Sequence, residues 1–165
     1  MVGTSNADAV YVFRTTDGGA TYDELAKLTA SDAAEGDMFG WSVAIDGGTI
    51  VVGTPYDDDA GLTSGSAYVF LTTDGGATYG QVAKLTASDG AASDYFGYSV
   101  AISGGTVVVG AYWDDDGGYS SGSVYVFSGA GSEGLVAGSD SALGSDAATR
   151  TGPLLALLVA AGLAL

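Results

Sequence analysis

The stretch FGWSVAIDGGTIVVGTP at residues 39–55 returns as FGYSVAISGGTVVVGAY at residues 96–112, which is 57 residues further along the chain. Each copy holds two runs rich in Val, Ile and Thr, separated by a Gly-Gly pair. Such a pattern is typical of two β-strands joined by a tight hairpin, because Gly adopts the positive φ that the turn needs. A spacing of 57 residues that recurs along the chain indicates an internal repeat.

Each period contains four segments with the composition of short strands, at residues 39–45, 49–54, 66–72 and 81–87. Four antiparallel strands per repeat are typical of a β-propeller blade. The runs TIVVG at 49–53 and TVVVG at 106–110 do not alternate with polar residues, which predicts strands covered on both faces by neighbouring blades. The sequence therefore predicts an all-β fold.

The predicted strands do not add up to a closed ring. A third strand at 9–15 and a fourth at 24–30 precede the complete blade, and three strands follow it up to Phe127, making nine. Propellers close with about 4–8 blades. Residues 1–127 therefore predict a partial β-propeller of about two four-stranded antiparallel blades, a fragment whose remaining blades are missing. Self-assembly of partial rings is the alternative, and MVGTSNAD at 1–8 is interpreted as the remnant of a preceding loop.

Composition excludes several function classes. Twenty acidic residues against four basic ones give a net charge of −16, which disfavours nucleic acid because binding there needs clustered Lys and Arg. The chain has no Cys and no His, which removes thiol nucleophiles, disulfides, soft zinc sites and His-based acid–base catalysis. Among metal ions, Ca²⁺ suits an all-oxygen site best.

The C-terminal part changes character. Residues 128–152 are rich in Gly, Ser, Ala and Asp and are predicted to be a linker. Residues 153–165 form an apolar tail of 13 residues, short of the roughly 20 that a membrane-spanning helix needs. With the small and polar residues before it, the tail resembles a GPI-attachment signal; a truncated transmembrane segment is the alternative. Membrane attachment through the tail and an extracellular or cell-surface location follow as expectations.

The repeated residues resemble the FG-GAP repeats of the integrin α-chain propeller. The residues that carry this resemblance are Phe39, Gly40, Gly53, Phe96, Gly97 and Gly110. Thr54 in place of Ala and Tyr112 in place of Pro depart from the family pattern. The resemblance implies a propeller that serves adhesion or ligand binding rather than chemistry.

The segment TTDGGATY, at 15–22 and 72–79, resembles the Asp-box of sialidase-like propellers. Asp17 and Asp74 are predicted to accept hydrogen bonds from backbone N–H groups of their own turns, a structural role. Tyr22 and Tyr79 take the position of the aromatic residue that packs under the hairpin. Sialidase catalysis uses an arginine cluster, and this chain has only two arginines, so the resemblance does not imply sialidase activity.

The calcium loop of integrin α-chains would lie between the two strands of each quoted stretch. DGGT at 46–49 and SGGT at 103–106 are too short to wrap an ion that needs six to eight oxygens. The aspartate triplets in the following loops are the other candidates. Because neighbouring side chains on extended backbone point opposite ways, one pair in each triplet is predicted to converge on a Ca²⁺ ion: Asp57 with Asp59, and Asp114 with Asp116. The alternative is a solvated loop whose aspartates cap turns.

Aromatic residues lie beside the triplets and are predicted to bind a protein or glycan ligand; they are Tyr56, Tyr112, Trp113 and Tyr119. For Tyr56 and Trp113, packing between blades is the alternative. Lys27 and Lys84 occupy the same place in successive fourth strands and are interpreted as edge residues that discourage strand pairing, not as catalytic groups.

No catalytic residue is predicted. The leading hypothesis is a non-enzymatic extracellular binding or adhesion module. The alternatives are a fragment of a propeller hydrolase or lyase whose catalytic residues lie in missing blades, and a structural cell-surface protein.

Overall fold

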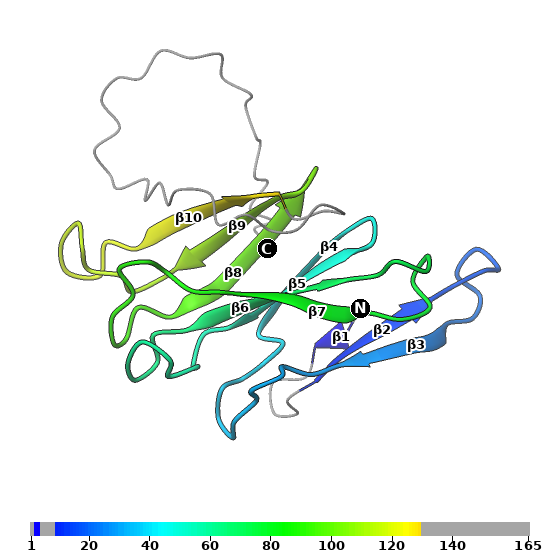
Figure 1. Ribbon diagram of the computed structural model, residues 1–165, viewed down its shortest axis with the longest axis horizontal. Helices are drawn as coiled ribbons and strands as arrows, with labels where there is room; N and C mark the ends of the chain where they lie inside the picture. The colour runs from blue at the N-terminus through cyan, green and yellow to red at the C-terminus, as the bar shows by residue number, and fades with distance from the viewer. Residues whose placement is uncertain (1, 4–8, 130–165) are drawn as a thin grey trace, which may run out of the picture.

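The computed structural model describes residues 2–3 and 9–129, which form three antiparallel sheets and no helix (Figure 1). The first blade has the strand order β1–β2–β3, the second β4–β5–β6–β7 and the third β8–β9–β10. The strands are β1 (Val2–Gly3), β2 (Val10–Arg14), β3 (Asp23–Leu28), β4 (Ser42–Asp46), β5 (Thr49–Thr54), β6 (Ser66–Leu71), β7 (Gly80–Leu85), β8 (Phe96–Ser103), β9 (Thr106–Ala111) and β10 (Ser123–Ser128). The predicted all-β class of partial propeller blades is confirmed.

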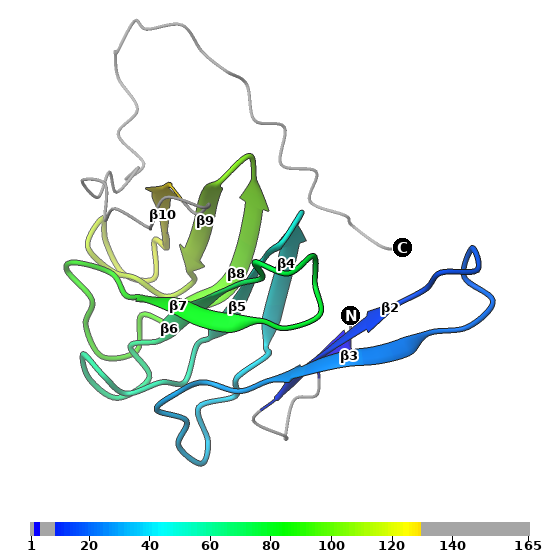
Figure 2. The same cartoon turned by 45° about the vertical axis from the view of Figure 1, so that its right-hand side comes forward.

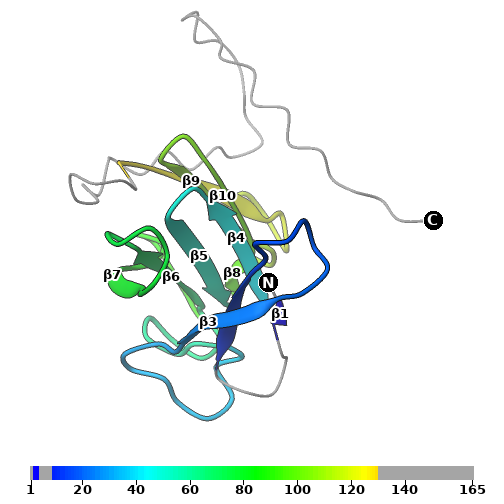
Figure 3. The same ribbon diagram turned by 90° about the vertical axis from the view of Figure 1, so that its right-hand side faces the viewer.

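The three blades lie side by side, with the second between the first and the third (Figures 1 and 2). Figure 3 looks along this stack from the side of the first blade, whose strands β2 and β3 lie in front of β4 and β5. Consecutive strands within a blade pair as neighbours, and the hairpins between β4 and β5 and between β8 and β9 close at Gly-Gly pairs, as predicted. Each blade is thus a meander.

The hydrophobic core consists of two clusters, one at each blade interface. The first cluster joins the first two blades through side chains that include Val10, Phe39 and Tyr68. The second joins the second and third blades through Val69, Phe96 and others. Since apolar burial stabilises by about 25 cal/mol per Å², these interfaces are where each blade gains most of its stability.

Strands β5 and β9 have nearly the same sequence but different burial. All six residues of β5 are buried, because Ile50 and Val52 face the first blade while Val51 faces the third. In β9, buried and half-buried residues alternate, since only one face of the third blade is covered by described residues. The continuous burial predicted from the apolar run is therefore confirmed for β5 and not for β9.

Most strand boundaries lie within one or two residues of the prediction, and the two larger differences are at β1 and β4. The structure adds β1, which pairs Val2 with Tyr11 and Gly3 with Val10, so that these two residues lie in a strand and not in a loop remnant. Strand β4 begins at Ser42 instead of residue 39, because Met38–Trp41 forms a turn in which the Trp41 N–H donates to the Met38 carbonyl at 3.1 Å.

The two Asp-box hairpins are built as predicted. Asp74 Oδ1 accepts hydrogen bonds from the N–H groups of Ala77 at 3.0 Å and Thr78 at 2.9 Å, and Oδ2 accepts one from the Thr78 hydroxyl at 2.6 Å. Asp17 makes the same bonds in the first blade. The Thr78 hydroxyl, followed by the backbone bonds, lowers the pKa of Asp74 far below its usual range. The hairpins are held by their own side chains, which is a structural role.

The aromatic residues of these hairpins differ in burial. Tyr79 is half-buried and packs on the first core cluster, whereas Tyr22 is 63% exposed. Both tyrosines lie against their own hairpins, since a Cβ on Gly19 would be 3.4 Å from the Tyr22 hydroxyl and one on Gly76 3.3 Å from that of Tyr79, but only Tyr79 also packs on a core cluster.

The predicted C-terminal features lie almost wholly outside the described residues. The linker at 128–152 overlaps them only at 128 and 129, and the apolar tail at 153–165, with its resemblance to a GPI signal, lies beyond them. In the part of the chain that the structure describes, no helix is long and apolar enough to cross a membrane.

Candidate functional site

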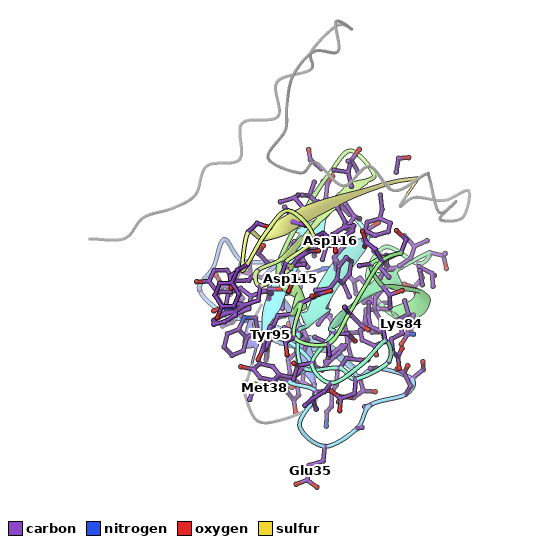
Figure 4. The ribbon with its side chains drawn as sticks, turned by 90° about the vertical axis from the view of Figure 1, so that its left-hand side faces the viewer. Glu35, Met38, Lys84, Tyr95, Asp115 and Asp116 are labelled. Atoms are coloured by element: carbon purple, nitrogen blue, oxygen red, sulfur yellow. The ribbon has the colours of Figure 1, made fainter. Side chains whose placement is uncertain are left out.

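Three groups of side chains carry the candidate chemistry. The lysine cluster consists of Asp32, Asp57, Asp59, Tyr68 and Lys84. The acid cluster consists of Asp89, Asp114, Asp116 and Tyr125. The aromatic patch consists of Trp41, Tyr56, Tyr95, Tyr98, Tyr112 and Trp113. Figure 4 labels Lys84 of the lysine cluster and Tyr95 of the aromatic patch, and the two groups adjoin in the chain where Tyr56 is followed by Asp57.

The aspartate triplet at 57–59 has the predicted alternation. Asp57 is buried and accepts a hydrogen bond from the Asp59 N–H at 3.1 Å, while Asp58 is exposed and accepts one from the Thr63 N–H at 2.6 Å. Asp57 and Asp59 were predicted to converge on a Ca²⁺ ion, and in the structure both contact the ammonium group of Lys84. Gly61, with φ of +144°, lets the loop turn back toward β6.

Lys84 forms three ion pairs within the lysine cluster. Its Nζ lies 2.7 Å from Asp32 Oδ2 and 3.0 Å from Asp57 Oδ2, and it also contacts Asp59 Oδ2. The ammonium group lies over the Tyr68 ring, 5.1 Å from its centroid. The Lys84 side chain is only 19% exposed. Lys84 lies on β7, an edge strand of the second blade, as predicted, but the carboxylates of Asp32, Asp57 and Asp59 surround its ammonium group.

The pKa values in this cluster favour the charged pairs. Burial alone would lower the pKa of Lys84, but hydrogen bonds with Asp32 and Asp59 outweigh it and raise that pKa well above its usual range. Burial likewise opposes ionisation of Asp32, yet the Lys84 hydrogen bond lowers the pKa of this carboxyl. The Tyr68 hydroxyl, 2.8 Å from Asp57 Oδ2 and 2.9 Å from Asp32 Oδ1, stays protonated because burial and these acceptors raise its pKa.

The acid cluster repeats this geometry in the third blade without the lysine. The Tyr125 hydroxyl lies 2.7 Å from Asp114 Oδ2 and 2.8 Å from Asp89 Oδ1, and the Asp116 N–H donates to Asp114 Oδ1 at 3.2 Å. The residue 57 positions after Lys84 is Ser141, which lies outside the described residues. The negative charge of Asp114, with that of Asp89, raises the pKa of Asp116. No ion pair among the described residues neutralises this cluster.

The aspartate triplets, which were predicted to bind Ca²⁺, do not form a metal centre in the described residues. The β4–β5 hairpin, where the related integrin loop would lie, is a tight turn whose Asp46 Oδ2 accepts the Gly104 N–H at 2.7 Å. Across residues 2–3 and 9–129, no group of three or more Asp, Glu, His or Cys side chains is arranged to hold a metal ion. In the lysine cluster the ammonium of Lys84 takes the place that a cation would occupy.

The aromatic patch forms a closed ring of contacts between the second and third blades. Successive ring centroids lie 5.0 to 6.4 Å apart, in the order Trp41, Tyr56, Tyr95, Trp113, Tyr112, Tyr98 and back to Trp41. These separations are typical of stabilising aromatic pairs. Four of the rings remain substantially exposed: Trp41 39%, Tyr98 38%, Tyr112 59% and Trp113 46%. The chain therefore presents a preformed aromatic surface.

Backbone strain holds part of this surface in place. Tyr95 has φ of +55°, which is unusual for a residue with a large side chain, and its N–H donates to the Thr63 carbonyl at 3.1 Å. Met38 occupies the equivalent position one repeat earlier, with φ of +57° (Figure 4). Strained residues at the same position of both repeats are kept by the surrounding structure, and such positions cluster at functional sites.

The four residues predicted to bind a ligand differ in their place in the aromatic patch and in their exposure. Tyr112 and Trp113 belong to it and are exposed, whereas Tyr56 is half-buried between Trp41 and Tyr95, as the packing alternative describes. Tyr119 is 91% exposed and has no aromatic contact among the described residues. The prediction missed Trp41, Tyr95 and Tyr98. Their signal is the aromatic residue that follows Phe-Gly in both repeats and, for Tyr95, the one that precedes it.

Comparison with known families agrees with the geometry of the repeats. A family model for the FG-GAP repeat matches residues 22–70 and again residues 79–127. Each match contains one Phe-Gly pair and one apolar second strand, β5 or β9. A comparison with curated proteins finds no match.

Proposed function

The chain belongs to the FG-GAP repeat family, and from this premise we propose that it is a non-enzymatic binding or adhesion module. It acts outside the cell or on the cell surface and holds a protein or glycan ligand on the aromatic patch. The observation that carries the proposal is the closed ring of six aromatic side chains, four of which remain substantially exposed. Exposed aromatic faces on a rigid scaffold bind sugar rings and apolar side chains with little loss of conformational entropy.

The polar groups support binding over catalysis. Tyr68 and Tyr125 are buried, and their hydroxyls and the carboxylates of Asp57 and Asp114 hydrogen-bond one another instead of pointing at the patch. A propeller hydrolase or lyase needs acids, bases or arginines directed at one substrate position. A structural cell-surface protein needs no ligand at all. Ligand titration separates the binding module from both alternatives.

Tryptophan fluorescence provides the test, because the only two tryptophans of the chain, Trp41 and Trp113, both lie in the patch. Titrating the full chain with chitohexaose, cellohexaose and gelatin should change the emission saturably for at least one probe. Trp113→Ala should weaken that binding by about tenfold or more, measured by calorimetry, as for an interface hot spot. Tyr22→Ala, an exposed aromatic substitution outside the patch, is the matched control and should bind as the unmodified chain does.

An absence of saturable change with all three probes would contradict the proposal, as would equal losses in the Trp113 and Tyr22 variants. Hydrolysis or elimination products in the titrated oligosaccharides would favour the enzyme alternative.

Calcium dependence is a second proposal, and it concerns the acid cluster only. Its support is the raised pKa of Asp116, because a bound cation would relieve the repulsion from Asp114 and Asp89. Asp114 and Asp116, whose loop is held by the hydrogen bond from the Asp116 N–H to Asp114 Oδ1, would supply the carboxylates, and backbone carbonyls or water would complete the six to eight oxygens that Ca²⁺ takes.

Ca²⁺ should raise the melting temperature of the full chain by a few degrees, and EDTA should reverse the rise. A ligand of the native state stabilises by RT ln(1 + [L]/Kd), and 1 kcal/mol shifts the melting temperature by about 2–4 °C at this chain length. Asp116→Asn should abolish the calcium response, while Asp115→Asn, an exposed aspartate in the same loop, should keep it. A melting temperature that does not change with calcium would refute the calcium proposal. It would not affect the proposal that the aromatic patch binds a ligand.

A further inference from the structure

The aromatic patch lies on a face of the molecule that is built from four loops. These loops connect β3 with β4, β5 with β6, β7 with β8 and β9 with β10, and they lie at the ends of the blades away from the hairpins (Figure 1). Backbone hydrogen bonds join each loop to the next. They run from the N–H groups of Tyr56, Ser93 and Trp113 to the carbonyls of Asp37, Leu62 and Asp94, over 3.4, 2.8 and 3.3 Å, respectively. The four loops therefore form one continuous surface, which we call the loop face.

The loop face is strongly acidic. Residues 29–41, 55–65, 86–95 and 112–122 contain eleven of the sixteen acidic residues in 9–129, and they contain no Lys or Arg. Lys84 on β7 reaches this face and neutralises part of its charge within the lysine cluster. The remaining carboxylates form no ion pair among the described residues. The loop face therefore attracts cations and repels anionic ligands.

Lys84 shows how this face holds a primary ammonium group. Its Nζ lies 2.7 Å from Asp32 Oδ2 and 3.0 Å from Asp57 Oδ2, and it lies 5.1 Å from the centroid of the Tyr68 ring. Two carboxylates and the face of a tyrosine thus surround the charge. Hydrogen bonds between ammonium groups and carboxylates are among the strong ones in proteins, because both partners are ionised.

The acid cluster repeats these residue types beside the aromatic patch. Asp114 directly follows Trp113 in the chain, and the next two residues, Asp115 and Asp116, are exposed. Figure 4 labels both of these aspartates together with Tyr95 of the patch. An ammonium group carried by a ligand of the patch would therefore meet exposed carboxylates in the same loop as the tryptophan.

The backbone of the loop face favours a glycan over a peptide. A bound peptide commonly pairs its backbone with free backbone groups at the edge of a sheet. On the loop face, the N–H groups of Tyr56, Tyr95 and Trp113 already donate to carbonyls of the neighbouring loops. Binding then depends on side chains: aromatic rings, which supply rigid area for sugar rings, and carboxylates, which pair with ammonium groups.

We propose that the ligand of the aromatic patch is a glycan whose sugar rings carry free, protonated amino groups. The exposed rings of the patch would stack on the sugar rings, and Asp115 and Asp116 would pair with the ammonium groups. This inference rests on the proposed function of the patch and adds the charge of the ligand. Acidic glycans should not bind, since the loop face repels them.

Two oligosaccharides that differ only in the acetyl groups on nitrogen provide the test. The hexamer of β-1,4-linked glucosamine carries ammonium groups at pH 6, whereas chitohexaose, its N-acetylated form, carries none. In calorimetric titrations of the full chain in the presence of EDTA, the glucosamine hexamer should bind about tenfold or more tightly than chitohexaose. The ratio of the two affinities should fall severalfold in about 1 M NaCl, where the Debye length is about 3 Å.

Chain variants locate the charge. Asp115→Asn combined with Asp116→Asn should remove most of the preference for the glucosamine hexamer and leave the affinity for chitohexaose unchanged. Asp23→Asn combined with Glu24→Gln changes the net charge by the same amount at exposed positions of β3 in the first blade. This matched control should keep the preference. Trp113→Ala should weaken the binding of both hexamers, because both stack on the patch.

Equal affinities for the two hexamers would overturn the inference and leave the proposed binding function standing. Failure of both hexamers to bind would also overturn it, and the gelatin titration would then decide the proposed function. A hexalysine peptide that binds as tightly as the glucosamine hexamer and competes with it would contradict the inference in favour of a basic peptide. Equal losses of preference in the two double variants would contradict it by attributing the preference to overall charge.

Discussion

Gly97→Ala is expected to destabilise the chain by about 4 kcal/mol or more, enough to unfold much of the population of a domain of ordinary stability. Gly97 has φ of +88°, a conformation that costs a residue with a Cβ about 1–2 kcal/mol. A Cβ there would also overlap the Ser66 carbonyl oxygen and lie 3.0 Å from the Thr54 nitrogen. Because these are backbone atoms of the second blade, they cannot move aside as a side chain would.

The effect should spread beyond the turn itself. Phe96 and Gly97 take part in two of the hydrogen bonds that join the third blade to the second, and Phe96 is among the largest fully buried side chains. Displacing the turn would therefore also disrupt the core cluster between the second and third blades, to which Phe96 belongs.

Urea unfolding followed by circular dichroism measures this loss. With a slope of about 1–3 kcal/mol per molar urea, a loss of 4 kcal/mol lowers the midpoint by about 2 M. Gly80→Ala is the control, since its Cβ would meet no atom within 4 Å and its φ is not positive. That variant should stay within about 0.5 to 1 kcal/mol of the unmodified chain. A Gly97→Ala midpoint close to that of Gly80→Ala would contradict the assigned role of the Phe-Gly turn.

The architecture could be predicted from the sequence because it depends on local patterns repeated at a fixed spacing. Strand β5 lies at the predicted residues, and the Gly-Gly turns and Asp-box hairpins form as predicted, since each depends on residues within one hairpin. The FG-GAP assignment is confirmed over both repeats. The 57-residue repeat also indicated that the aspartate triplets at 57–59 and 114–116 occupy equivalent positions in successive repeats.

Side-chain partners across the blades could not be predicted in the same way. Lys84 meets Asp32 and Asp57, which are 52 and 27 residues away along the chain, and the spacing of a meander does not tell which side chains meet. The aromatic patch was predicted only in part, because the contacts between its rings depend on the packing of two blades and on turns such as the one at Tyr95, whose φ is +55°. The partners of Lys84 and the contacts of the aromatic patch both depend on how neighbouring blades pack against each other.

The second large effect is expected at this lysine: Lys84→Met should cost about 3 kcal/mol of stability. Removing one member of a buried ion pair costs about 3–5 kcal/mol, because the remaining charge has no partner, and the lower end applies since Lys84 is partly exposed. Asp57, 4% exposed, would keep a carboxylate in the protein interior with no cation beside it. In Lys84→Met with Asp57→Asn the combined loss should be smaller than the sum of the single losses, because the two side chains interact directly.

The size of the effect should depend on pH at both ends of the range. The raised pKa of Lys84 means that its contribution is complete below the unfolded value of about 10.4 and is lost as pH rises through the higher folded pKa. The lowered pKa of Asp32 means that its contribution is present above about 3.9 and is lost as pH falls through the lower folded pKa. The stability difference between the unmodified chain and Lys84→Met should therefore be largest between about pH 5 and 9 and should shrink beyond both limits.

The equivalent lysine of the preceding repeat is the control. Lys27 lies over the Tyr11 ring, 5.7 Å from its centroid, but it is exposed and forms no ion pair with a described residue. Lys27→Met should therefore cost less than about 1 kcal/mol, the range of an exposed cation–π contact. Thermal and urea unfolding of both variants at pH 4, 7 and 10.5 give the comparison. Equal losses of stability in Lys84→Met and Lys27→Met would mean that the carboxylates around Lys84 do not contribute to stability beyond its packing on tyrosine. A stability difference that does not change with pH would exclude the explanation based on charge.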